Sequence, residues 1–241
     1  MLRLRNITKD FTKTRAVDSL SFELKKGRVC GFVGPNGAGK TTVFNCLSGF
    51  LRADEGNIEF HHRPINHLKP HQICQLGLVR TFQIVKPFQT ISVLDNVMIG
   101  ALSKERSTIR AEKKSREIIA FLGLSDWTDD KAQGLPLPLR KRLELARALA
   151  TEPKVLLLDE VMAGLNPTEV DELIVLLKKV NAQGTSILLI EHVMRGVMAL
   201  SQRVIVINHG VKIAEGPPED VVKDKEVIKA YLGKEFLSAQ G

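Results

Sequence analysis

One eight-residue stretch limits the possible folds of this chain more than any other feature. The stretch GPNGAGKT, residues 34–41, fits the pattern G-x-x-x-x-G-K-[S/T]. It follows the apolar run VCGFV (29–33), which predicts a buried strand, and leads into TTVFNCLSG (41–49), which predicts a helix. In such a unit the loop glycines turn backbone N–H groups toward phosphate oxygens, and the helix N-terminus adds its positive dipole end. The pattern predicts a phosphate-binding α/β domain.

The residue types around this loop indicate a magnesium–nucleotide site. Lys40 would reach the β- and γ-phosphates, and the Thr41 hydroxyl would bind Mg²⁺. The run VLLLDE places Asp159 at the end of another buried strand, where it would meet the metal directly or through water. Glu160 follows as the natural general base for a water that attacks the γ-phosphate. The nucleotide contacts expected in the loop are Gly34, Pro35, Asn36, Gly37, Ala38, Gly39, Lys40, Thr41 and Thr42.

The rest of the chain shows the periodicity of a layered α/β protein. Alternating apolar residues at 2–5 and 20–24 predict half-exposed antiparallel strands. Unbroken apolar runs predict parallel strands buried on both faces, and they lie at 29–33, 155–159, 186–190 and 203–207. Between two of these runs a helix is expected, with Thr168 and Asp171 as its capping box and Gly184 at its end. The sheet should be mixed, with right-handed crossovers.

The chain divides into three stretches. Residues 1–87 and 151–241 carry the strands, and they form the first and second parts of the nucleotide-binding core. Residues 88–150 contain helical patterns with no buried strand between them, which predicts an inserted helical subdomain. The tail from residue 217 predicts a mixed polar helix that ends near Gly233.

Composition excludes little beyond membrane spans and disulfides. No run approaches the roughly 18 apolar residues of a spanning helix, and the N-terminus lacks the apolar core of a signal peptide, so a cytosolic chain is expected. An excess of 35 basic over 27 acidic residues permits phosphate-rich ligands, nucleic acid or an anionic membrane without choosing among them. The cysteines are odd in number and lack C-x-x-C spacing, which predicts reduced thiols at Cys30, Cys46 and Cys74. Four histidines near Cys74 match no standard metal-ligand set and are expected at the surface: His61, His62, His67 and His71.

The order of the motifs resembles the nucleotide-binding subunits of ABC transporters over nearly the whole chain. RTFQ (80–83) puts Gln83 at the Q-loop position, and LELARALATEPKVLLLDE (143–160) matches the helix that leads to the Walker B strand. AGLNPTE (163–169) matches the D-loop, although Asn166 replaces the aspartate of many members, and IEHVM (190–194) puts His192 at the switch position. GLVRTFQIVKPFQTISVLDNVMIG and the ending KAYLG are most similar to ATPase subunits of branched-chain amino acid importers.

The resemblance implies an ABC ATPase fold and Mg²⁺-dependent ATP hydrolysis. By the same resemblance, Phe11 would stack on adenine, Gln83 would sense Mg²⁺ and water while linking to the permease, and His192 would contact the γ-phosphate. Each of these residues has an ordinary alternative. Phe11 could be a core residue, and a histidine after a buried strand could be purely structural.

The signature motif departs from the family. LPLPL (135–139) lies on the family's LSGGQ, so Pro136 replaces the serine and Pro138 the second glycine, and proline donates no backbone hydrogen bond. The family's loop acts in trans, on ATP held by a partner subunit. The first turn of a helix tolerates Pro138. Arg140, Lys141 or Arg142 could supply positive charge to the phosphate, and Arg140 is the candidate among them. Alternatively, the three basic residues form a solvated helix face. The signature residues are Leu135, Pro136, Leu137, Pro138, Leu139 and Arg140.

The expected function is that of an ATPase subunit that drives a separate transmembrane permease, most similar to branched-chain amino acid import. Expected partners are the permease, a second ATP-binding subunit in a heterodimer with unequal sites or in a homodimer, and indirectly a solute-binding protein. The expected location is peripheral, on the cytoplasmic face of the inner membrane, and no nucleic-acid partner is expected. The alternatives are lipid export or uptake of an amide, urea or aromatic acid, a soluble ABC ATPase of translation or DNA repair, and a regulatory nucleotide-binding module without turnover.

Overall fold

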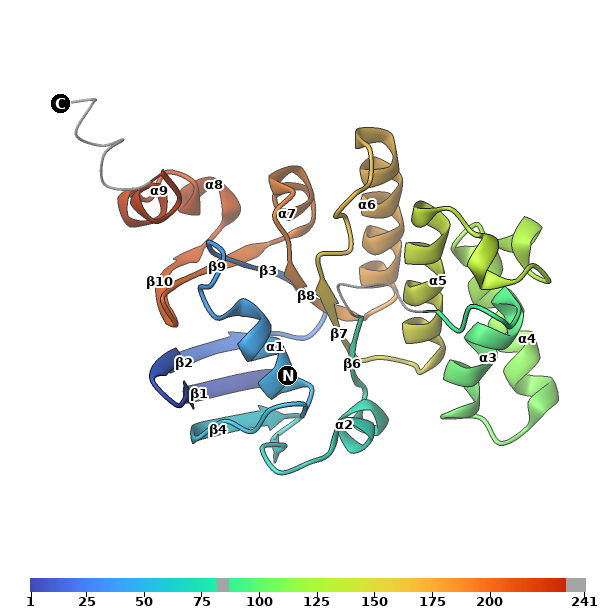
Figure 1. Ribbon diagram of the computed structural model, residues 1–241, viewed down its shortest axis with the longest axis horizontal. Helices are drawn as coiled ribbons and strands as arrows, with labels where there is room; N and C mark the ends of the chain where they lie inside the picture. Colours follow the sequence, from blue (N-terminus) through green and yellow to red (C-terminus); the bar gives the residue numbers. More distant parts are fainter. Residues whose placement is uncertain (82–86, 233–241) are drawn as a thin grey trace.

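A computed structural model describes residues 1–81 and 87–232 of the chain (Figure 1). An N-terminal sheet has the order β2-β1-β4-β5, and every pairing in it is antiparallel. Alternate side chains of its first strand, such as Leu2 and Leu4, are buried, which confirms the antiparallel strands predicted from the period-two pattern. The strands are β1 (Leu2–Phe11), β2 (Thr14–Leu24), β4 (Glu55–Phe60) and β5 (Arg63–Pro64).

The main sheet has six strands in the order β10-β9-β3-β8-β7-β6. Its pairings are parallel except for β10 with β9, so the sheet is mixed as predicted. All five residues of β3, of β7 and of β8 are buried, as their unbroken apolar runs require. The strands are β3 (Val29–Val33), β6 (Leu78–Arg80), β7 (Val155–Asp159), β8 (Ser186–Ile190), β9 (Arg203–Asn208) and β10 (Val211–Gly216).

The two faces of the main sheet pack against different layers. Leu156 and Leu158 of β7 join one apolar cluster, with residues of α3, α5 and α6, whereas Leu157 joins a second cluster with α1 and the N-terminal sheet. The helix α1 thus lies between the two sheets, and the loop before it is held at the carboxyl edge of β3. The helices in this core are α1 (Lys40–Leu47), α2 (Pro70–Leu76), α6 (Pro167–Ala182) and α7 (Met194–Leu200).

Three helices gather on the side of the molecule away from the N-terminal sheet (Figure 1). They pack against one another through buried residues such as Val97, Ile119 and Leu143, with no strand among them apart from the bridge of Ser92 to Lys131 in the described part of the stretch. These helices are α3 (Val93–Leu102), α4 (Thr108–Phe121) and α5 (Leu137–Ala150), with short 3₁₀ turns at Ser125–Trp127 and Ala132–Gly134.

Two local predictions were wrong. The capping box of α6 is formed by Asn166 and Glu169, not by Thr168 and Asp171: Asn166 Oδ1 accepts the Glu169 N–H at 3.0 Å, and Glu169 Oε2 accepts the Asn166 N–H at 2.8 Å. Pro167 is favoured at the first helical position, so the cap falls on the residue before it.

The tail forms two short helices in place of one. They are α8 (Pro218–Val221) and α9 (Lys225–Leu232), and the Asp224 carboxylate accepts the Glu226 N–H at 2.8 Å between them. Gly233 lies outside the described residues.

Candidate nucleotide-binding site

The phosphate loop fits between β9 and β2 only because of two glycines. A Cβ on Gly34 would lie 2.2 Å from the Ile207 carbonyl oxygen of β9, and a Cβ on Gly39 would lie 2.3 Å from the Ala16 carbonyl oxygen of β2. Gly39 also has φ of 102° and caps α1, a conformation that other residues rarely adopt. The loop therefore approaches two strands more closely than any side chain allows.

Lys40 is buried in the first turn of α1 and folds back over this loop. Its Nζ donates to the Gly34 carbonyl at 2.7 Å and to the Pro35 carbonyl at 2.9 Å. Burial lowers the pKa of the ammonium, while the Glu160 and Asp159 carboxylates act in the opposite direction. The structure thus brings the predicted phosphate-binding lysine close to the predicted acidic pair. Thr41 beside it is exposed, so its hydroxyl is open to a ligand.

The ends of β7 and β8 bring together Glu160 and His192. Glu160 Oε1 lies 2.9 Å from His192 Nε2, and the Glu160 N–H donates to the Ile190 carbonyl at 2.9 Å. Glu160 has φ of +51°, in the left-handed region where a non-glycine residue costs about 1–3 kcal/mol. Such strain is concentrated at functional sites, and here it turns the carboxylate toward the histidine. The two residues are 32 positions apart in the sequence.

Glu191 supports this pair, and the sequence patterns gave it no role. Its side chain is buried and accepts the Met162 N–H at 2.7 Å and the His192 N–H at 3.3 Å. Burial raises the pKa of this carboxyl, and the three backbone donors oppose that effect. Glu191 therefore ties the loop after Glu160 to the backbone of His192. The signal in the sequence was a charged residue directly after the buried run of β8.

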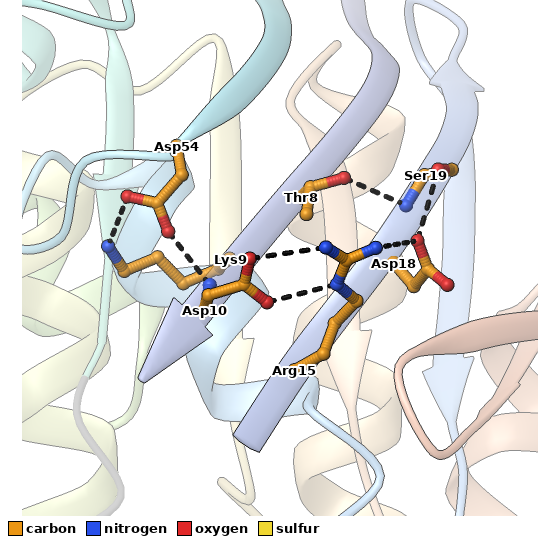
Figure 2. A network of polar contacts seen from close by, with 7 residues as sticks. All are labelled: Thr8, Lys9, Asp10, Arg15, Asp18, Ser19 and Asp54. Carbon is orange, nitrogen blue, oxygen red and sulfur yellow. Dashed lines mark hydrogen bonds and ion pairs between the residues drawn. The ribbon is translucent and has the colours of Figure 1, made fainter. Parts of the chain in front are cut away.

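Phe11 ends β1 at the surface, 43% exposed, so it is not a core residue. A network of polar contacts holds the hairpin that carries it (Figure 2). The Asp10 carboxylate accepts a hydrogen bond from Arg15 Nε at 3.0 Å, and Asp54 accepts from the Asp10 N–H and from Lys9 Nζ, both at 2.8 Å. Lys9 Nζ also lies 5.5 Å from the centroid of the Phe11 ring. Each of these surface ion pairs contributes little alone, but together they hold the end of β1, and therefore Phe11, in place.

The signature loop, whose sequence departs from the family pattern, begins α5. Pro136 is its N-cap and Pro138 its second residue, where a missing N–H costs no intrahelical hydrogen bond. Lys141 is turned inward and donates to the Glu160 carbonyl at 3.2 Å, and Arg142 forms an ion pair with Glu172. Arg140 is half-buried, and its Nε has no hydrogen-bond partner among residues 1–81 and 87–232.

The structure therefore brings Lys40, Asp159, Glu160 and His192 together, whereas the signature residues start a helix well away from α1 (Figure 1). Gln83, the third predicted metal-site residue, lies outside the described residues.

The donor set suits Mg²⁺. A hydroxyl and a carboxylate are hard oxygen donors, and Mg²⁺ is usually bound through one or two carboxylates together with substrate phosphates and water. Among the described residues there is no group of three or more histidine, cysteine or acidic side chains that could form an all-protein metal cage. The four histidines near Cys74 are exposed, as predicted.

Arg80 is a second functional candidate that the sequence patterns did not reveal. It ends β6, and its Nη2 lies 2.7 Å from Asp159 Oδ2. This contact keeps the predicted metal ligand next to a second cation. Burial raises the pKa of Asp159, and the guanidinium opposes the rise.

Comparison with known proteins decides the family. The sequence profile described as ABC transporter matches residues 17–163, and that described as branched-chain amino acid ATP-binding cassette transporter matches residues 211–236. The chain belongs to the ABC transporter family. It is 38% identical to the high-affinity branched-chain amino acid transport ATP-binding protein LivG of Salmonella typhimurium, over 97% of this chain and 98% of that protein. It is 36% identical to BraF of Pseudomonas aeruginosa over the same shares.

Solved structures agree with this assignment. A nucleotide-free ATP-binding cassette of an ABC transporter superposes with a TM-score of 0.88 at 33% identity, covering 97% of this chain and 99% of that one. The ADP conformation of such a cassette gives the same values. The chain has the ABC ATPase fold, as predicted, and it is an ATP-binding and ATP-hydrolysing subunit. None of the helices in its described part has the length and apolarity needed to cross a bilayer.

Proposed function

We propose that this ATPase subunit powers import of branched-chain amino acids or a related small solute through a separate permease. The observation that carries the proposal is the match of the tail, residues 211–236, to the branched-chain cassette profile, beside near-full-length similarity to LivG and BraF. The phosphate loop alone would fit any ABC ATPase. The tail match favours the branched-chain importer group over the lipid-export and soluble ABC alternatives.

In the proposed reaction this chain grips the triphosphate of ATP through residues 34–42, and Phe11 stacks on adenine. Thr41, Asp159 and Gln83 would hold Mg²⁺, which neutralises charge that develops on the phosphates. Glu160 takes the proton of the attacking water, and His192, 2.9 Å away, holds that carboxylate and contacts the γ-phosphate. Lys40 is already fixed over the loop, so little reorganisation is needed when phosphate binds.

Two cassettes are needed for a complete site. The signature residues at the start of α5 lie apart from the chain's own α1, so they would act on ATP held by another ATP-binding subunit (Figure 1). Closure around two ATP molecules and reopening after hydrolysis would drive the permease. ATP can drive closure only to the extent that it binds the closed dimer more tightly than the open one.

The permease would dock at the edge of the helical subdomain, 88–150, near Gln83–Gly100. Phe88, Ile99 and Leu102 are apolar and exposed there, although large side chains of this kind are usually buried. Asn96 fixes Phe88 by bonding both its N–H and its carbonyl, at 2.8 and 3.0 Å. The core parts, 1–87 and 151–241, would bind the nucleotide. Such docking would place the subunit peripherally on the cytoplasmic face of the inner membrane.

The test is reconstitution in proteoliposomes of the chain with the permease, companion ATPase and solute-binding protein that are encoded beside it. Leucine, isoleucine or valine should stimulate phosphate release and enter the vesicles, and Glu160→Gln should abolish both effects. Stimulation by an amide, urea or an aromatic acid, without any response to branched-chain amino acids, would assign a different solute. Nucleotide-driven lipid movement would overturn import altogether.

A further inference from the structure

Arg80 connects three elements of the nucleotide site. From the end of β6 its Nη1 donates to Asn45 Oδ1 of α1 at 2.6 Å, and its Nη2 donates to Asp159 Oδ2 of β7 at 2.7 Å. The Ser48 hydroxyl lies 3.4 Å from Nη1, and the guanidinium carbon lies 5.7 Å from the centroid of the Phe44 ring. The side chain therefore bridges the helix that follows the phosphate loop and the strand that carries the metal ligand.

The pair is almost fully buried. The side chain of Arg80 is 6% exposed and that of Asp159 is 2% exposed. A buried ion pair is often no more stabilising than apolar residues of the same size, because both charges lose their hydration. Stability alone thus gives no reason for a buried arginine at this place. A role in positioning the Asp159 carboxylate does give a reason.

The position also gives the arginine a fixed geometry. β6 pairs in parallel with β7, with Arg80 beside Leu157, and the Thr81 N–H then donates to the Leu157 carbonyl at 2.9 Å. The planar guanidinium can hold two acceptors in set directions, which lysine cannot. Here one guanidinium nitrogen donates to Asn45 on α1 and another donates to Asp159 on β7.

We propose that Arg80 is a positioning residue for ATP hydrolysis, which holds the Asp159 carboxylate against α1 and shares that carboxylate with Mg²⁺. The proposal rests on the role of Asp159 given under the proposed function. Two cations at one buried carboxylate repel each other, so Arg80 weakens Mg²⁺ binding while it fixes where the carboxylate lies. Removal of the arginine should then have opposite effects on metal binding and on turnover.

The variants are Arg80→Gln, Arg80→Lys and Asn45→Ala, with Arg203→Gln as the matched control. Arg203 forms an ion pair with Glu215 at 2.9 Å on the same sheet, away from Asp159, and is 46% exposed. The first measurement is the Mg²⁺ concentration that half-saturates binding of a fluorescent ATP analogue. The second is the melting temperature in EDTA and in Mg²⁺ with ADP, and the third is kcat for phosphate release.

Arg80→Gln should need about tenfold less Mg²⁺ for half-saturation, because a nearby positive charge is gone. Its kcat should fall by about 10²-fold or more, as when a preorganised catalytic contact is lost. Its melting temperature should fall more in EDTA than with Mg²⁺ and ADP, since the metal then pairs with Asp159. Arg80→Lys should lie between this variant and the wild type, and Arg203→Gln should match the wild type in all three measurements.

If Arg80 had a purely structural role, the changes in Mg²⁺ binding and in melting temperature would differ from these. Weaker Mg²⁺ binding in Arg80→Gln, or equal loss of melting temperature in both buffers, would overturn the proposal. If Arg80→Gln does not fold, Asn45→Ala decides: it keeps the ion pair, so kcat should fall at an unchanged Mg²⁺ half-saturation, and unchanged kcat would count against positioning. Failure of wild-type protein to bind Mg²⁺ and ATP would overturn the proposed function instead.

Discussion

At the scale of single residues, Glu160 joins an unusual backbone conformation to a short contact. Its left-handed φ of +51° places the carboxylate 2.9 Å from His192, directly after a strand whose residues are all buried. Glu160→Gln keeps the shape but cannot accept a proton, so phosphate release should fall by about 10²–10⁴-fold. ATP binding, followed with a fluorescent analogue, should stay within about twofold of the wild type. An equal loss of ATP affinity would contradict the assignment as base, and Glu219→Gln, at an exposed position of α8, is the control.

The cysteines give a second prediction at this scale. Burial raises the pKa of Cys30 to about 12 and of Cys46 to about 11, whereas Cys74 is partly exposed. Iodoacetamide at pH 8 should therefore label Cys74 first and the other two only after unfolding, as read by mass spectrometry. Labelling of Cys30 in native protein at the rate of Cys74 would contradict the burial.

The same raised pKa values predict how stability depends on pH. Above pH 9.0, the ordinary pKa of a cysteine thiol, the folded protein holds the thiol protons of Cys30 and Cys46 more tightly than the unfolded chain does. The free energy of unfolding should therefore decline as the pH rises toward 11.

At the scale of elements, the N-terminus of α6 lies directly after the loop that follows Glu160. Its Asn166 cap satisfies the Glu169 N–H, and Glu169 returns the bond. Asn166→Ala should lower the free energy of unfolding by about 0.5–2 kcal/mol. Thr168→Ala is the matched control, because that residue is exposed in the first turn and caps nothing. Urea denaturation measures both, and a larger loss for Thr168→Ala would restore the capping box first predicted from the sequence.

Elements were predictable where their signal is local. The runs at 29–33, 155–159, 186–190 and 203–207 gave the parallel strands because burial on both faces leaves no polar alternation. β6 was missed, because three residues within GLVR are too few to show a period. The α6 cap was misplaced by two residues, since several Ser, Thr, Asn and Asp near a helix start can each cap it.

The residues of the site also divide into those with a local sequence signal and those without one. The glycine pattern around Lys40 is local and gave the phosphate loop, and the resemblance to ABC ATPases supplied Gln83 and His192. The contact of Arg80 with Asp159 joins residues 79 positions apart and depends on which strands neighbour each other, which no local pattern states. Glu191 was passed over because its role is to bind backbone N–H groups that only the folded loop brings near.

At the scale of the whole molecule, the phosphate loop and the signature loop would belong to different sites of the proposed dimer. The chain's own loop lies with Asp159, Glu160 and His192, the residues that we propose take part in hydrolysis. Its signature loop offers Pro136 and Pro138 where the family has donors to phosphate. Loss of one such donor costs roughly 10²–10³ in rate if nothing replaces it. Arg140 lies half-buried at the start of α5 with its Nε unpaired in the described structure, and it is our candidate to replace that donor.

From this arrangement we predict a heterodimer with unequal sites. With a companion ATPase whose signature loop is intact, the ATP held by this chain meets the good signature, and the ATP held by the companion meets the proline-containing one. Glu160→Gln in this chain should therefore remove most of the phosphate release, and the equivalent change in the companion should remove little. Arg140→Ala should slow only the companion's site, because the proposed role of Arg140 is to face the ATP held by the companion. Equal losses from the two glutamate changes would show that the prolines impose no penalty, and full activity of this chain alone as a homodimer would show that a companion is unnecessary.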